Sequence, residues 1–223
     1  LHCLLIPAHS KDESMTPQEL GATYDYIAPL YQRDMLHSDY GLSALRRAIR
    51  YCPIVGDALD VGCGVGGRLI DALQQAGFTP EGIDVSAGML SLAQQAHPGL
   101  GFCRADICQW QSQRRFALIL AWDSLFPLPL NEHEPVLRKL CRLLDDNGVL
   151  IYSFGDAEGS HIDQWHGRDF HYSSIGISEN LRVLMSEGLT ILHCERDQHP
   201  QSHVYVIAHK RQKDEGASAQ RLL

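Results

Sequence analysis

The chain has few basic residues for its size, and its start lacks the features of a targeting or membrane segment. Lysine and arginine number 19 against 27 aspartate and glutamate residues, which gives a formal net charge of -8. Because nucleic-acid affinity depends on Lys and Arg neutralising phosphates, we expect a small-molecule partner and no nucleic acid. The apolar opening LHCLLIP has no basic lead and is too short to span a bilayer. We therefore expect neither a signal peptide nor membrane association.

Cysteine is present, but not in a pattern typical of a metal or disulfide site. The count of seven is odd, and no two cysteines form a C-x-x-C pair. Most lie inside apolar runs such as residues 137–144, where cysteine behaves as a small hydrophobe. His161, His166 and His171 recur at five-residue intervals, which is no diagnostic ligand spacing. The sequence therefore predicts reduced thiols, a cytoplasmic location and no metal.

Length and composition are typical of one globular domain with short extensions. The 223 residues include 44% hydrophobic and 21% charged residues, and they contain no internal repeat. Met15 stands directly before a helix start. We expect flexible tails at 1–14 and 211–223, and a single domain over 15–210 in which residues 15–52 form an N-terminal helical cap.

Two helices are predicted in this cap. Thr16-Pro17-Gln18-Glu19 has the form of a capping box with proline at the first helical position, and apolar residues then recur at helical spacing. Pro29 is expected to kink or end this helix. The pattern of leucine, isoleucine and arginine that follows predicts a second helix over about 40–51.

Beyond residue 57, short apolar runs alternate with amphipathic stretches, the pattern of βα units in a doubly wound α/β fold. The predicted strands are 58–62, 80–85, 100–105, 116–122 and 149–154, and the predicted helices lie near 67–76, 87–96 and 132–144. After a further helix near 178–187, the strands 189–195 and 203–209 are joined by a short link and should pair antiparallel. The sequence therefore predicts a mostly parallel sheet that ends in an antiparallel hairpin.

The segment ALDVGCGVGG, residues 58–67, carries four glycines between a strand and a helix. Glycine lets the backbone turn tightly and lets a ligand approach the helix N-terminus. Gly62, Gly64 and Gly67 fit G-x-G-x-x-G, and Asp84 follows at the separation expected for a ribose-binding carboxylate, so a dinucleotide is one candidate ligand. A packing turn that holds no ligand is another reading.

Asp60 favours a different ligand on grounds of charge. A dinucleotide would place its anionic pyrophosphate close to this carboxylate, at an electrostatic cost. S-adenosylmethionine has no phosphate and carries an ammonium and a sulfonium, which a carboxylate attracts. The loop is therefore expected to hold S-adenosylmethionine.

With these motifs in order, residues 16–210 resemble the class I S-adenosylmethionine-dependent methyltransferases, the seven-stranded Rossmann-like family. The family's glycine motif is similar to residues 60–64, its acidic residue after the second strand to Asp84 in GIDVSAGML, and its residue after the third strand to Asp106 in CRADI. Its fourth-strand motif is similar to LILAWDSLFPLP. The resemblance implies methyl transfer to a small-molecule acceptor.

The resemblance also implies a set of cofactor-binding residues. Asp60 and the backbone of Gly62 and Gly64 would hold the methionine end, and Asp84 the ribose hydroxyls. The remaining members, which would contact the adenosine or the methyl group, are Met89, Asp106, Ile107 and Ala121. Asp84 and Asp106 have an alternative role as caps of the following turns or helices, and Met89 as a core residue.

The acceptor is expected near the carboxyl end of the fourth strand, at Trp122 and Asp123. The N/D-P-P-Y/F sequence of enzymes that methylate base amino groups is absent there, and related small-molecule enzymes often have histidine where this chain has Pro127, so no catalytic base is assigned. A long loop over 155–178, with His171, is predicted to act as a lid and specificity element.

Tyr24 and Tyr31 lie one helical repeat apart on the first helix, and they are either acceptor-site residues or core. Two other functions stay open beside methyl transfer. One is a non-catalytic S-adenosylmethionine-binding protein, and the other is a nicotinamide-dependent oxidoreductase.

Overall fold

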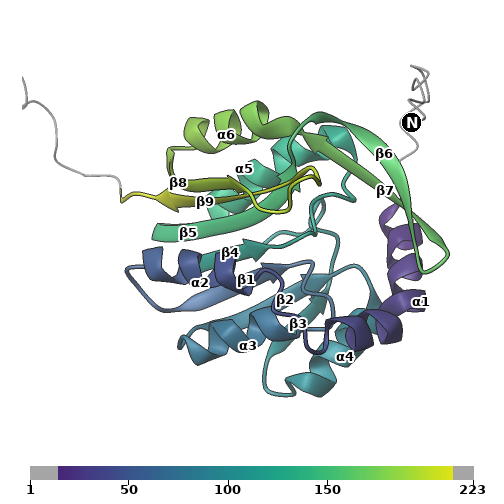
Figure 1. Ribbon diagram of the computed structural model, residues 1–223. Coiled ribbons are helices and arrows are strands. Elements are labelled where there is room, and N and C mark those ends of the chain that lie inside the picture. Colours follow the sequence, from purple (N-terminus) through teal and green to yellow (C-terminus); the bar gives the residue numbers. More distant parts are fainter. Residues whose placement is uncertain (1–14, 213–223) are drawn as a thin grey trace, which may run out of the picture.

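The computed structural model is built on a seven-stranded sheet in the order β3-β2-β1-β4-β5-β9-β8 (Figure 1). It describes residues 15–212, so the predicted tail at 1–14, and residues 213–223 of the predicted tail at 211–223, lie outside it. The strands are β1 (Asp57–Val61), β2 (Thr79–Asp84), β3 (Gly101–Arg104), β4 (Phe116–Ala121), β5 (Leu144–Gly155), β8 (Leu189–Arg196) and β9 (His203–Lys210). Neighbours among β1 to β5 pair parallel, and β9 runs antiparallel between β5 and β8. The predicted doubly wound sheet with an antiparallel end is confirmed.

Helices cover both faces of this sheet. They are α1 (Pro17–Met35), α2 (Leu42–Tyr51), α3 (Arg68–Gln75), α4 (Ala87–Ala96), α5 (His133–Leu143) and α6 (Gly176–Ser186), with a 3-10 turn η1 (Leu130–Glu132) before α5. Leu45 of α2 and Leu73 of α3 belong to the core on one face, and Leu137 of α5 and Val183 of α6 to the core on the other. Because the central strands are buried on both faces, they read as continuous apolar runs in the sequence.

Helix α1 begins as the sequence predicts but does not end at Pro29. The Thr16 hydroxyl accepts a hydrogen bond from the Glu19 amide at 3.2 Å, and the Glu19 carboxylate accepts one from the Thr16 amide at 2.8 Å. The helix continues through Pro29 to Met35. Proline inside a helix costs about 3 kcal/mol, and the complete burial of Ile27 beside it offsets that loss.

The segment predicted as a long loop over 155–178 is instead a β-hairpin, so that expectation is wrong. Strands β6 (Glu158–Trp165) and β7 (Arg168–Ile175) pair antiparallel and turn at His166-Gly167. Both turn residues have positive φ, at 49° and 72°, which is typical of the two-residue turns that match strand twist. The turn of the hairpin lies beside α1 (Figure 1).

The hairpin is held by aromatic packing on α1. Phe170 is 1% exposed, and its ring lies 5.2 Å from that of Tyr24. The Trp165 ring lies 5.7 Å from that of Tyr31. On the opposite side, α1 is tied to α4 because Asp25 accepts hydrogen bonds from the Ser86 hydroxyl at 2.6 Å and the Gly88 amide at 2.7 Å. Helix α1 and the hairpin therefore form one cover over the edge of the sheet.

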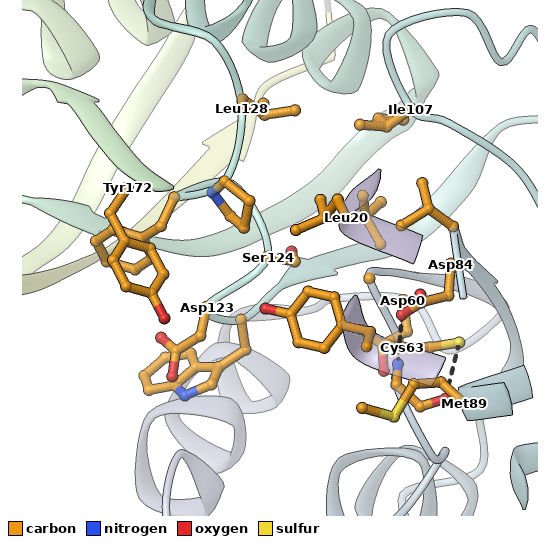
Figure 2. A pocket seen from close by; sticks show the side chains of 18 of the residues that line it. Leu20, Asp60, Cys63, Asp84, Met89, Ile107, Asp123, Ser124, Leu128 and Tyr172 are labelled. Atoms are coloured by element: carbon orange, nitrogen blue, oxygen red, sulfur yellow. Dashed lines mark hydrogen bonds between the residues drawn. The ribbon is translucent and has the colours of Figure 1, made fainter. Parts of the chain in front are cut away.

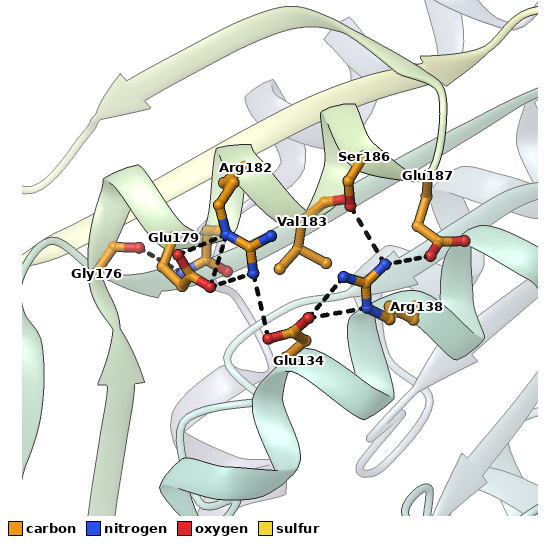
Figure 3. A network of polar contacts seen from close by, with 9 residues as sticks. Glu134, Arg138, Gly176, Glu179, Arg182, Val183, Ser186 and Glu187 are labelled. Carbon is orange, nitrogen blue, oxygen red and sulfur yellow. Dashed lines mark hydrogen bonds and ion pairs between the residues drawn. The ribbon is translucent and has the colours of Figure 1, made fainter.

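A network of ion pairs joins α5 to α6 at the surface (Figure 3). Arg138 of α5 binds Glu134 at 2.6 Å and Glu187 at 2.5 Å, and Arg182 of α6 reaches Glu134 at 3.3 Å. Exposed pairs of this kind contribute little to stability, so the apolar contacts beneath them hold the two helices together. Within residues 15–212, no helix has both the length and the apolar character of a membrane span.

Candidate active site

A cavity of about 1390 Å³ opens at the carboxyl ends of the parallel strands. Its walls come from the segments that follow β1, β2, β3, β4 and β5, and from the start of β9, which runs in the opposite direction and so begins at this edge. Side chains of α1 and the hairpin, among them Leu20 and Tyr172, also line it (Figure 2). Open α/β sheets bind their ligands at this edge.

The glycine bend after β1 forms one wall of the cavity. Gly62 and Gly64 have φ of 70° and 53°, a region that residues with a Cβ rarely adopt. A Cβ on Gly62 would lie 2.2 Å from the Cβ of Ser124. The Gly62 amide donates to the Ile83 carbonyl at 2.8 Å, which ties the bend to β2. Only glycine at position 62 allows β1 and the segment after β4 to approach this closely.

Asp60 is the penultimate residue of β1, just before this bend, and is 4% exposed. Burial and, to a lesser extent, the charge of Asp84 raise the pKa of its carboxyl to about 7, while Arg68 acts in the opposite direction. Among the described residues, no hydrogen bond reaches the Asp60 carboxylate, although the side chain lines the cavity. A buried carboxylate of this kind is stabilised by a cation, and the cavity gives a cation access to it.

Asp84 ends β2 and holds two backbone amides. Its Oδ2 accepts from the Gly64 amide at 2.9 Å and its Oδ1 from the Ser86 amide at 2.8 Å. Burial raises the pKa of Asp84, against the effect of these hydrogen bonds. The residue fixes the glycine bend and the start of α4 and also lines the cavity. The structure therefore shows the capping role that the sequence gave as an alternative, and the role of Asp84 at the ribose hydroxyls stays a prediction.

Three other predicted cofactor residues line the cavity and one does not. Met89, 2% exposed, and Ile107, 7% exposed, present apolar surface to it. Asp106 also lines it, while its Oδ1 accepts from the Cys108 amide at 2.9 Å. Ala121 is fully buried in the core on the α5 face and lies outside the cavity lining, because the side chains at the end of β4 alternate between the two faces.

The predicted acceptor residues divide in the same way. Tyr24, Tyr31, Trp122 and Asp123 all line the cavity. His171 does not line it. This residue pairs across the hairpin with Ile162, which is 59% exposed. Its neighbours Phe170 and Tyr172 lie on the other face of the strand, toward α1 and the cavity. Strand alternation therefore turns His171 away from the site, and its expected role there is wrong.

Asp123 is held by residues that the sequence did not single out. Its Oδ1 accepts a hydrogen bond from the Ser153 hydroxyl at 2.7 Å and lies 2.8 Å from His203 Nε2. His203 Nδ1 lies 2.5 Å from Asp197 Oδ1. Asp123 has a φ of 54°, and its amide donates to the Ser153 hydroxyl at 2.7 Å, which stabilises this unusual backbone. Asp123, His203 and Asp197 are called the Asp–His–Asp cluster below.

The contact of His203 with Asp123 was not predicted from the sequence, because the two residues are 80 positions apart. The direction of the last strand could have placed His203 in the site. A strand that runs antiparallel to β5 begins at the edge of the sheet where the parallel strands end, and His203 is the first residue of β9. Burial alone would lower the pKa of His203, but the hydrogen bonds and charges of Asp123 and Asp197 outweigh it and raise that pKa.

Comparison with known proteins identifies the same segment of the chain. Residues 58–148 match the family model described as a methyltransferase domain. The chain is 32% identical over 133 residues to a trans-aconitate 2-methyltransferase of Rhizobium etli, a match that covers 58% of this chain and 47% of the relative. It is 36% identical over 108 residues to the Escherichia coli O7:K1 enzyme of the same name, covering 46% and 41%. The chain thus spans less than half the length of these relatives.

Solved structures agree over a longer stretch. A methyltransferase from Clostridium acetobutylicum superimposes with a TM-score of 0.65 at 15% identity, covering 85% of this chain and all of that one. Magnesium protoporphyrin IX methyltransferase from Synechocystis, with bound S-adenosylmethionine, gives 0.67 at 19% identity, covering 89% and 99%. The fold is therefore that of the S-adenosylmethionine-dependent methyltransferases. The match of residues 58–148 to the methyltransferase-domain model agrees with the resemblance found in the sequence.

Proposed function

We propose that the chain binds S-adenosylmethionine in the cavity and transfers its methyl group to a small molecule. The observation that carries this proposal is the buried Asp60 carboxylate, which faces the cavity beside a glycine bend and has no hydrogen bond among the described residues. Such a site attracts the ammonium and sulfonium of S-adenosylmethionine and repels a diphosphate. The named relatives and structural neighbours support the same reaction class.

The residues that line the cavity fit this cofactor in a definite order. Asp60 and the backbone of Gly62 and Gly64 would hold the methionine end, and Asp84 the ribose hydroxyls. The Ser124 hydroxyl is buried beside Gly62 with no hydrogen-bond partner in residues 15–212, so a polar group of the cofactor would satisfy it. Met89, Asp106 and Ile107 would contact the adenosine.

When bound, S-adenosylmethionine supplies an electrophilic methyl group. The protein contributes position and exclusion of water, because displacement at a methyl carbon needs donor and acceptor in line. The glycine bend fixes the donor side, and Tyr24 and Tyr31 of α1, with Tyr172 of the hairpin, cover the space between the two ligands. Asp123 (Figure 2) and its neighbour Trp122 line the cavity and would stand on the acceptor side of this space.

Several finer statements belong to the same proposal. We assign residues 15–210 to one methyltransferase-like domain with the helical cap at 15–52. A cytoplasmic location and the absence of nucleic-acid and membrane partners follow from the composition alone. The two alternative functions, a non-catalytic binder and a nicotinamide-dependent oxidoreductase, predict different ligand responses.

Thermal unfolding with added ligand separates these functions. A ligand at 100 times its dissociation constant adds about 2.7 kcal/mol to stability. We expect S-adenosylmethionine and S-adenosylhomocysteine to raise the melting temperature and NADH to leave it unchanged. Release of S-adenosylhomocysteine in the presence of an acceptor then distinguishes an enzyme from a binder. Stabilisation by NADH alone would overturn the proposal.

A further inference from the structure

The acceptor side of the cavity contains the Asp–His–Asp cluster, whose charge bears on the class of acceptor. The two ring nitrogens of His203 each face a carboxylate oxygen, Nε2 that of Asp123 at 2.8 Å and Nδ1 that of Asp197 at 2.5 Å. An ionised carboxylate only accepts hydrogen bonds, so two such partners favour the imidazolium form of the ring, in line with the raised pKa of His203. Two carboxylates and one imidazolium leave a net charge of one negative unit.

That negative charge is accessible from the cavity at Asp123. The Asp123 side chain is 40% exposed, whereas those of His203 and Asp197 are 9% and 21% exposed. The hydrogen bonds from Ser153 and His203 both go to Oδ1. Asp123 therefore presents carboxylate surface to whatever fills the acceptor side.

Aromatic rings surround the same point. The Trp122 ring centre lies 5.5 Å from that of His203, and the Phe126 ring stacks on His203 at 5.9 Å. Tyr172 meets Phe126 edge-on at 6.3 Å, and Tyr40 lies 6.1 Å from His203. Aromatic walls beside a carboxylate form the environment that a cationic ligand prefers.

Positive side chains that could pair with an anionic acceptor are scarce here. Among the described residues that line the cavity, Arg68 is the only lysine or arginine. Its Nε donates to the Tyr40 carbonyl at 2.6 Å, and its guanidinium lies 5.7 Å from the centre of the Tyr40 ring. Glu158 and Asp163 add further carboxylates to the lining. An acceptor with carboxylate groups of its own would meet repulsion.

We propose that the methyl acceptor is a primary or secondary amine, bound as an ammonium ion at Asp123 between the aromatic walls. This inference rests on the proposed methyltransferase function. The Asp123 carboxylate takes one proton from the ammonium, which leaves a lone pair on nitrogen. The nitrogen then bonds to the methyl carbon while the carbon–sulfur bond breaks and its electron pair stays on sulfur. The products are an N-methylammonium ion and S-adenosylhomocysteine, and Asp123 returns its proton to solvent.

Three probes that share one ring test the charge preference. Benzylamine, benzyl alcohol and benzoate are titrated calorimetrically into the chain saturated with S-adenosylhomocysteine, and trans-aconitate is added as a polycarboxylate. We expect benzylamine to bind at least about 10-fold more tightly than the other three, as one additional charge pair provides. With S-adenosylmethionine, a product heavier by one methyl group should form from benzylamine.

The variant Asp123→Asn removes the charge and keeps the shape. We expect it to weaken benzylamine binding by about 100-fold, the effect of breaking a desolvated charge pair, and to leave the affinity for S-adenosylhomocysteine within about 3-fold of wild type. Asp169→Asn, an exposed hairpin residue outside the cavity lining, is the matched control and should leave both affinities unchanged.

The possible outcomes separate this inference from the proposed function. Tighter binding or methylation of benzoate or trans-aconitate overturns the amine assignment and leaves methyl transfer intact. Equal binding of all four probes, or no binding of any in the S-adenosylhomocysteine complex, also overturns it. Failure of S-adenosylhomocysteine itself to bind overturns the proposed function instead.

Discussion

The ionisation of Asp60 should make the affinity for S-adenosylmethionine depend on pH. The pKa of this carboxyl is raised by burial to about 7, so in the free protein it is largely protonated at pH 5. A ligand ammonium needs the ionised form, and each pH unit below the pKa costs about 1.4 kcal/mol of binding free energy. We therefore expect the dissociation constant to be about 100-fold larger at pH 5 than at pH 8.

Calorimetric titration at pH 5, 6, 7 and 8 measures this dependence, and Asp60→Asn tests its source. The variant should bind more weakly at pH 8 and show a dissociation constant that changes little over the series. Asp57→Asn is the matched control, because Asp57 begins the same strand, is half-exposed and pairs with Arg114 outside the cavity. An equally steep pH profile in Asp60→Asn would refute the reasoning.

The same ionisation has an opposite effect on the stability of the free protein. The folded pKa of Asp60, about 7, lies above the ordinary value of 3.8, so the folded state holds the proton more strongly than the unfolded state. Its stabilising effect is complete below pH 4 and is lost as pH rises to 7, a change of about 4 kcal/mol. Urea unfolding should show this loss in wild type relative to Asp60→Asn, and a difference that stays constant from pH 4 to 8 would contradict the assignment.

Two further predictions concern the bend and the hairpin. Gly62→Ala should abolish S-adenosylhomocysteine binding in calorimetry, because the new Cβ would lie 2.2 Å from that of Ser124. Gly101→Ala is the control and should bind normally, since the nearest atom to its new Cβ would be 3.8 Å away. Equal affinities of the two variants would disprove the steric argument. Phe170→Ala should lower the free energy of unfolding by about 3–5 kcal/mol. Ile162→Ala, at an exposed position of the same hairpin, should change the free energy of unfolding by less than about 0.5 kcal/mol. Similar losses of stability in the two variants would show that the hairpin does not depend on the buried Phe170 ring.

The fold was largely predictable because its signals are local. The strands predicted over 58–62 and 116–122, which are β1 and β4 in the structure, are apolar enough to be buried on both faces, and the Thr16 capping box sets the start of α1 where expected. The continuation of α1 through Pro29 was not predictable, since it depends on packing of Ile27 against residues far away in the sequence.

The hairpin at 158–175 was missed for a similar reason. Its strands are rich in polar residues, and the turn His166-Gly167 is a weaker signal than Asn-Gly. Contacts with residues far away in the sequence, such as those of Phe170 and Trp165 with α1, stabilise these strands.

The order of the strands along the chain was enough to predict part of the candidate site. Asp60, Gly62, Gly64 and Asp84 end neighbouring parallel strands or follow them directly, so their convergence follows from the topology. Ala121 and His171 were misplaced because their orientation depends on which face of a strand they occupy. His203 was missed because it reaches Asp123 only through the antiparallel placement of β9.

The central claim is that the cavity beside Asp60 holds the methyl donor. A crystal structure of the chain with S-adenosylhomocysteine tests it most directly. We predict that the amino group of the ligand lies within hydrogen-bond distance of the Asp60 carboxylate or the glycine bend, with the ribose hydroxyls at Asp84. Electron density for the ligand at another surface, or a bound ligand that leaves the Asp60 carboxylate without a cationic or hydrogen-bonding neighbour, would contradict it.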